Sequence, residues 1–111
     1  EDDRISCAGE SIYPKEVENV LMKHPDVADV AAVAMADDLK GEVPVAFVIE
    51  KVTRRIDAED LKQFFLANGA AYMHPRRVFM VDEMPLTSAR KLDRSALRVM
   101  AEEARARGAG G

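Results

Sequence analysis

The sequence contains one cysteine, Cys7, and two histidines, His24 and His74, among its 111 residues. A single cysteine excludes an intrachain disulfide and cannot form a cysteine-based metal site. Neither histidine has a partner at metal-ligand spacing, so we expect no bound metal. A chain without disulfides fits the reducing cytosol, and we therefore expect a cytoplasmic protein.

Long apolar runs and an excess of basic residues are also missing. No apolar run approaches the roughly 20 residues that cross a bilayer, so we expect no membrane insertion. The formal net charge is -4, whereas a general nucleic-acid binder needs clustered Lys and Arg to neutralise phosphates. One basic cluster exists, at His74, Arg76 and Arg77, but the chain as a whole is acidic. We therefore expect no nucleic-acid partner.

The sequence lacks the signatures of a self-contained active site. It has no Ser-His-Asp or Cys-His arrangement, and no glycine-rich phosphate loop followed by Lys and Ser or Thr. It opens on Glu1-Asp2-Asp3-Arg4 without an initiator methionine or an apolar signal region, which indicates a piece of a longer protein. We therefore expect these 111 residues alone to show no catalytic turnover.

What is present is the composition of one compact domain. The hydrophobic fraction is 48% and the charged fraction is 32%, which is ordinary for a globular protein. Runs rich in β-forming residues predict three main strands, at residues 27–35, 43–49 and 78–81. Apolar periodicity predicts three amphipathic helices, at residues 14–24, 58–68 and 93–106. We expect an α+β fold with a small three-stranded sheet covered by amphipathic helices in two layers, spanning residues 1–107, and a flexible tail at 108–111.

Local signals predict where several of these elements begin and end. Asp57 and Asp93 are typical N-cap residues for the second and third helices. Gly69 is predicted to stop the second helix in a left-handed conformation. Residues 5–7 form a candidate short strand directly before Ala8 and Gly9.

The segment Pro85-Leu86-Thr87-Ser88-Ala89-Arg90-Lys91 lies between the last strand and the last helix, and is predicted to be a loop. Loops on a rigid scaffold commonly carry function, so Lys91 is a candidate functional cation. From this loop alone, an ordinary solvated lysine explains the residue more simply. Other motifs must decide between the two interpretations.

Five motifs follow one another along the chain. They are Asp-Asp-x-Ile, then Gly-Glu-x-Ile-Tyr-Pro-x-Glu-Val-Glu, then His-Pro-x-Val-x-Asp-Val-Ala, then Gly-Glu-x-Pro-x-Ala-Phe-Val, and last Pro-x-Thr with a Lys before a Leu-x-Arg helix. In this order they resemble the C-terminal domain of AMP-forming acyl-CoA synthetases, over roughly residues 2–98. The resemblance implies a mobile part of an acid–CoA ligase.

The resemblance implies a partner, a large N-terminal adenylating domain of the same chain that holds ATP and the carboxylic acid. Lys91 stands at the position of the lysine that serves adenylate formation, where a compact cation offsets developing negative charge. Asp2 matches the hinge, and Gly9 matches the glycine that lines the tunnel for the pantetheine arm of CoA. ATP, Mg²⁺ and CoA are then substrates of the complete enzyme, and none of them is expected to bind this domain alone.

The resemblance also implies contacts with the nucleotide part of CoA. His74, Arg76 and Arg77 fall where family members often place basic residues, although a solvated strand edge explains them without a ligand. Lys40 stands where many relatives carry an aromatic residue that stacks on adenine, and a lysine could contact a phosphate instead.

One residue departs from the family pattern beside the lysine itself. Many relatives have glycine directly before the catalytic lysine, and this chain has Arg90. Because arginine does not adopt a positive φ cheaply, we expect the loop geometry around Lys91 to differ.

Two other functions stay open. An α+β domain of this size could be a non-catalytic binding or interaction module, or the lid of a related adenylate-forming enzyme that loads a carrier protein. A phosphate-binding loop and about 400 residues of adenylating domain upstream of Glu1 would favour the enzyme, since that exceeds a single small domain. The acid is not specified by these residues, so aryl, short-chain, medium-chain and carnitine-like substrates all stay open.

Overall fold

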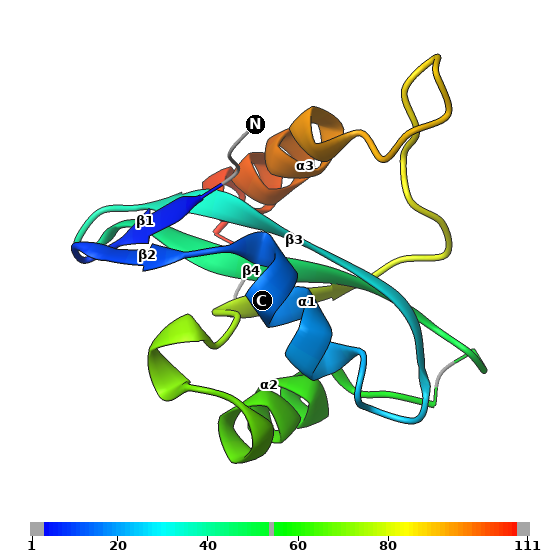
Figure 1. Cartoon of the computed structure of the whole chain (residues 1–111). Coiled ribbons are helices and arrows are strands. Elements are labelled where there is room, and N and C mark those ends of the chain that lie inside the picture. The colour runs from blue at the N-terminus through cyan, green and yellow to red at the C-terminus, as the bar shows by residue number, and fades with distance from the viewer. Residues whose placement is uncertain (1–3, 54, 109–111) are drawn as a thin grey trace.

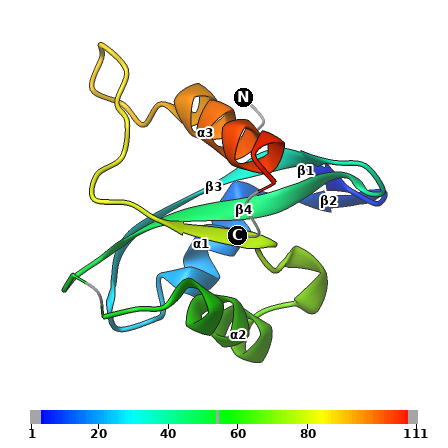
Figure 2. The same cartoon turned by 180° about the vertical axis from the view of Figure 1, so that it is seen from behind.

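The computed structural model describes residues 4–53 and 55–108. The elements follow in the order β1 (Ile5–Cys7), β2 (Glu10–Ile12), α1 (Pro14–Leu21), β3 (Val27–Asp37), β4 (Gly41–Glu50), α2 (Ala58–Asn68), the 3-10 helix η1 (Ala71–Met73), β5 (Arg77–Met80) and α3 (Arg94–Ala106). α3 lies on one face of a single sheet, and α1 and α2 lie on the other face (Figure 1, Figure 2). The α+β class predicted from the sequence is confirmed.

The sheet is mixed, with the strand order β2-β1-β4-β3 and with β5 also paired to β4. β3 and β4 form a long antiparallel hairpin, and β1 and β2 form a short one. β1 meets β4 through Cys7 and Gly41, while β5 runs parallel to β4 from Val45 to Val48. Because β3 occupies one edge of β4, β1 and β5 share the other edge.

The sheet has five strands rather than the three predicted, and helices on both of its faces make three layers rather than two. β1 and β2 have three residues each, which is too short for an alternating pattern to identify the pair. The second covered face explains the continuous buried run from Val43 to Val48 in β4, since a strand covered on both sides carries no polar alternation. No helix in the described part of the chain is long and apolar enough to cross a membrane.

The N-caps predicted for the second and third helices are confirmed. The Asp57 side chain accepts a hydrogen bond from the Glu59 amide at 3.2 Å, and the Asp93 side chain accepts one from the Ala96 amide at 3.0 Å. α2 begins and ends where the sequence predicts. The first helix is shorter than predicted, because it ends at Leu21.

Gly69 ends α2 for a reason other than the one predicted. Its φ is -142°, an extended conformation and not a left-handed one. A Cβ at this position would lie 3.0 Å from Cε1 of Phe65 and 3.1 Å from Cγ2 of Val20. Gly69 therefore allows α1 and α2 to pack closely beneath the sheet.

Candidate functional site

The segment between β5 and α3 carries Lys91 and extends away from the body of the domain, as the yellow and orange loop of Figure 1 shows. Lys91 is exposed. Within the described residues, its ammonium has no hydrogen-bond or ion-pair partner. The domain thus presents an exposed cation on a protruding segment, and no group of the described residues pairs with it.

Backbone hydrogen bonds fold this segment into a small hairpin. The Thr87 amide donates to the Lys91 carbonyl at 2.8 Å, and Leu86 pairs with Leu92 in an isolated antiparallel bridge. The Thr87 hydroxyl oxygen accepts from the amides of Ala89 at 3.2 Å and of Lys91 at 3.3 Å. The lysine backbone is therefore held on both its N–H and its C=O by one threonine.

Arg90 adopts a left-handed conformation with a φ of +63°. Its amide donates to the Thr87 carbonyl at 2.8 Å, so a turn is followed by a left-handed residue, as in common three-residue hairpin loops. Arg90 thus adopts the positive φ that its residue type disfavours. Closure of the hairpin between Thr87 and Lys91 imposes the positive φ, and Arg90 bears the steric strain that a glycine would avoid.

Asp93 closes the base of the hairpin. Its amide donates to the Pro85 carbonyl at 2.9 Å, and its carboxylate caps α3. The two ends of the hairpin are thus tied together where the helix begins.

Two tight turns meet at the opposite end of the sheet from this hairpin (Figure 1, Figure 2). The β1–β2 turn has positive φ at both central residues, +53° at Ala8 and +86° at Gly9. The Ala8 amide donates to the carbonyl of Lys40 in the β3–β4 turn at 2.8 Å. The structure therefore places Gly9 beside Lys40, and it places the hairpin that carries Lys91 at the other end of the sheet.

A Cβ on Gly9 would meet no atom of the described chain within 4 Å. Inside this domain Gly9 is thus explained by its turn conformation alone, because positive φ favours glycine. The open space above it leaves room for a ligand or another domain to approach the backbone.

His74 and Arg76 are partly buried and bond mainly to backbone carbonyls. Nδ1 of His74 donates to the Ala71 carbonyl at 2.8 Å, since a carbonyl can only accept. The Arg76 guanidinium donates to the carbonyls of His74 and, at 3.4 Å, of Tyr72, and it lies 3.7 Å from Sγ of Cys7. These side chains hold η1 against β1, next to the Gly9 turn.

Arg77 has unused hydrogen-bonding capacity. It pairs with Val45 at the start of β5, and its Nη1 is buried without a hydrogen-bond partner in the described part of the chain. Lys40 is exposed and leaves its ammonium available at the same end.

The remaining predicted site residue, Asp2, lies outside the described residues. Among the residues that are described, no group of three or more His, Cys, Asp or Glu side chains is arranged to hold a metal ion.

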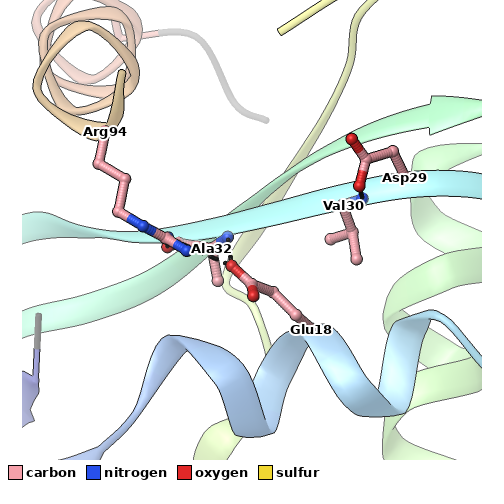
Figure 3. A network of polar contacts seen from close by, with 5 residues as sticks. All are labelled: Glu18, Asp29, Val30, Ala32 and Arg94. Atoms are coloured by element: carbon pink, nitrogen blue, oxygen red, sulfur yellow. Dashed lines mark hydrogen bonds and ion pairs between the residues drawn. The ribbon is translucent and has the colours of Figure 1, made fainter. Parts of the chain in front are cut away.

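Sequence reasoning missed a pair of charged residues that meet at the edge of β3 (Figure 3). Glu18 of α1 accepts a hydrogen bond from the Ala32 amide at 2.9 Å, and Arg94 of α3 donates to the Ala32 carbonyl at 2.8 Å. The two side chains also pair with each other at 3.2 Å. One sequence signal existed, since Glu18 lies beside Val17 and one turn before Leu21, on the apolar side of its helix.

Residues 16–91 match the profile of a protein family described as the AMP-binding enzyme C-terminal domain. The match runs from the first turn of α1 to Lys91 and covers more than half of the chain. The chain is 40% identical over 101 residues to a 2-succinylbenzoate–CoA ligase of Bacillus cereus. The aligned residues cover 91% of this chain and 21% of the relative. The chain thus spans about a fifth of the length of the curated relatives it matches.

Solved structures of related proteins have the same fold. Apo MatB from Rhodopseudomonas palustris matches with a TM-score of 0.85 at 25% identity, over 91% of this chain and 20% of that one. The o-succinylbenzoate CoA synthetase MenE from Bacillus subtilis matches with a TM-score of 0.78 at 33% identity, over 89% of this chain and 20% of that one. The chain therefore belongs to the AMP-binding enzyme C-terminal domain family, whose relatives here are acyl-CoA ligases and other adenylate-forming enzymes.

Proposed function

We propose that this chain is the mobile C-terminal domain of an AMP-forming acid–CoA ligase and works against an N-terminal adenylating domain. The complete enzyme uses ATP with Mg²⁺, a carboxylic acid and CoA. The observation that carries the proposal is the Lys91 ammonium, which stands unpartnered among the described residues at the tip of a hairpin held by Thr87. The Thr87 contacts fix the backbone from which the ammonium projects.

In the first half-reaction, a carboxylate oxygen attacks the α-phosphorus of ATP, a new C–O–P linkage forms, and pyrophosphate leaves. Negative charge gathers on the attacking and phosphate oxygens in the transition state. The Lys91 ammonium is a compact point charge on a flexible stem, and it offsets this charge when the hairpin reaches into the neighbouring active site.

In the second half-reaction, the CoA sulfur attacks the acyl carbon, the thioester forms, and AMP leaves. We assign this step to the opposite end of the sheet, where the Gly9 turn meets the pantetheine arm. Lys40, Arg76 and Arg77 lie at that end, and we infer that they contribute positive charge toward the nucleotide part of CoA, with His74 beside them as a further contact.

The two ends cannot serve one active site at the same time. The domain measures 37 × 36 × 29 Å, and the Lys91 hairpin and the Gly9 turn lie at opposite ends of the sheet (Figure 1). The domain must therefore rotate between the half-reactions, and we place the hinge at Asp2, just before β1. The carboxylic acid is chosen by the N-terminal domain, so these residues support CoA ligation more strongly than any particular acid.

The test uses the full-length protein in which this chain occurs. Lys91→Ala should lower ATP–pyrophosphate exchange by about 10²–10³-fold, the usual effect of removing one preorganised charge donor. Lys23→Ala removes another exposed lysine just after α1 and should leave the exchange unchanged. A non-catalytic interaction module predicts no difference between the two variants, and equal exchange rates would reject the proposal.

A further inference from the structure

We propose that Arg94 and Glu18 are positioning residues for Lys91: they fix the base of its hairpin to the edge of β3, and so set where the ammonium lies during adenylation. This inference rests on the proposed function, because it assigns a supporting pair to the same lysine. Neither residue needs to touch a substrate.

The Glu18–Arg94 pair lies at the edge of the sheet. β3 is a terminal strand of the described sheet, so within residues 4–53 and 55–108 no neighbouring strand bonds to the outward N–H and C=O groups of Ala32. Glu18 accepts from that N–H at 2.9 Å, and Arg94 donates to that C=O at 2.8 Å. The two side chains therefore bond to Ala32 as a neighbouring strand would.

Arg94 and Glu18 contact each other as well as Ala32. Arg94 Nη1 lies 3.2 Å from Oε2 of Glu18, and the side chains are only 31% and 13% exposed. One guanidinium nitrogen thus contacts a carboxylate and a carbonyl, while the carboxylate also accepts from an amide. This closed set of contacts joins α1, β3 and α3 at one point (Figure 3). Lysine carries the charge of Arg94, but its ammonium sits on a flexible stem and lacks the rigid guanidinium plane that aims Nη1 at both oxygens.

A short stretch of chain connects Arg94 to Lys91. Arg94 is the first residue of α3, and it follows Lys91 by three positions. Asp93, between them, bonds to Pro85 and ties together both ends of the hairpin. Loss of the Arg94 anchor frees the first turn of α3 to shift, and a shift of about 1 Å at a catalytic group can cost about 10²-fold in rate.

A purely structural role of Arg94 and Glu18 would give a different pattern of activity losses. Sealing the edge of β3 protects the sheet, and its loss would weaken folding and both half-reactions together. A positioning role predicts loss of adenylation alone, and no further loss once Lys91 has been removed.

The experiment compares Arg94→Ala, Arg94→Lys and Glu18→Gln in the full-length protein. Each variant is assayed for ATP–pyrophosphate exchange and for thioester formation from supplied acyl-adenylate. Arg98→Ala is the matched control, since Arg98 lies one turn further along α3 and its ion pair, at 3.8 Å, is with Glu42 and not with Glu18.

We expect Arg94→Ala to lower the kcat of exchange by about 10-fold or more, with KM and the thioester rate little changed. Arg94→Lys and Glu18→Gln should show smaller losses of the same kind, and they keep the test valid if the alanine variant folds poorly. In a Lys91→Ala background, Arg94→Ala should have no further effect.

The outcomes separate the two proposals. If Lys91→Ala leaves exchange intact, the proposed function fails and this inference fails with it. If Lys91→Ala lowers exchange as proposed, the inference alone is overturned by any of three results: an Arg94→Ala rate equal to that of Arg98→Ala, parallel loss of both half-reactions, or additive losses in the double variant.

Discussion

Replacing Arg90 by glycine should stabilise the protein, which is unusual for a substitution in an ordered turn. Arg90 is the left-handed residue of the Lys91 hairpin, with a φ of +63°. Its side chain is exposed and has no partner among the described residues, so truncating it removes no contact. The substitution therefore isolates the backbone strain.

The magnitude follows from two opposing contributions. An L-residue in the left-handed region costs about 1–2 kcal/mol, which glycine avoids. Glycine also lowers the free energy of unfolding by about 0.5–1 kcal/mol, because the unfolded chain with glycine has more conformational freedom to lose on folding. The free energy of unfolding should rise by about 0.5–1 kcal/mol, and at about 2.1 cal/mol/K per residue the Tm should rise by about 2–4 °C.

Urea denaturation and calorimetry of the 111-residue chain measure the effect, with Ser88→Gly as the control. Ser88 lies in the same hairpin, is exposed, and is not among the residues with positive φ, so glycine brings only its entropic cost of about 0.5–1 kcal/mol. The two variants should therefore change stability in opposite directions. Equal destabilisation by both would show that Arg90 is not strained and would refute this reading of the hairpin.

Two further predictions concern the scaffold. Gly69→Ala should destabilise the chain by about 1–3 kcal/mol in urea denaturation, because its Cβ would crowd Phe65 at 3.0 Å and Val20 at 3.1 Å. An unchanged denaturation midpoint would show that α1 and α2 are packed loosely enough to accept the methyl group. Asp57→Ala should cost about 1 kcal/mol by removing the cap of α2, and Asp57→Asn should retain most of the stability. Equal loss in both Asp57 variants would contradict the capping role.

The sequence predicts those features that depend on neighbouring residues. Asp57 and Asp93 cap their helices because a side-chain oxygen reaches an amide two or three positions later, and that chemistry is local. The loop character of the Lys91 segment is equally local, since it follows from a strand pattern, a proline and a cap.

Features that depend on distant residues were beyond the sequence. Arg90 is a local exception: the hairpin from Thr87 to Lys91 closes around it and imposes a positive φ that its residue type disfavours. Glu18 and Arg94 are separated by 76 positions and meet only when α1 and α3 both reach the edge of β3. The contact of Ala8 with Lys40 likewise depends on two separate hairpins. The resemblance therefore pointed to Gly9 and Lys40 individually but did not predict that their turns touch.

The most direct test of the account measures both half-reactions on one preparation of the full-length Lys91→Ala variant. The account predicts that adenylate formation falls by about 10²–10³-fold, while thioester formation from supplied acyl-adenylate keeps nearly its original rate. Equal losses in the two half-reactions, or no loss in adenylation, would contradict the claim that this domain carries one cation to the first step and a separate end of its sheet to the second.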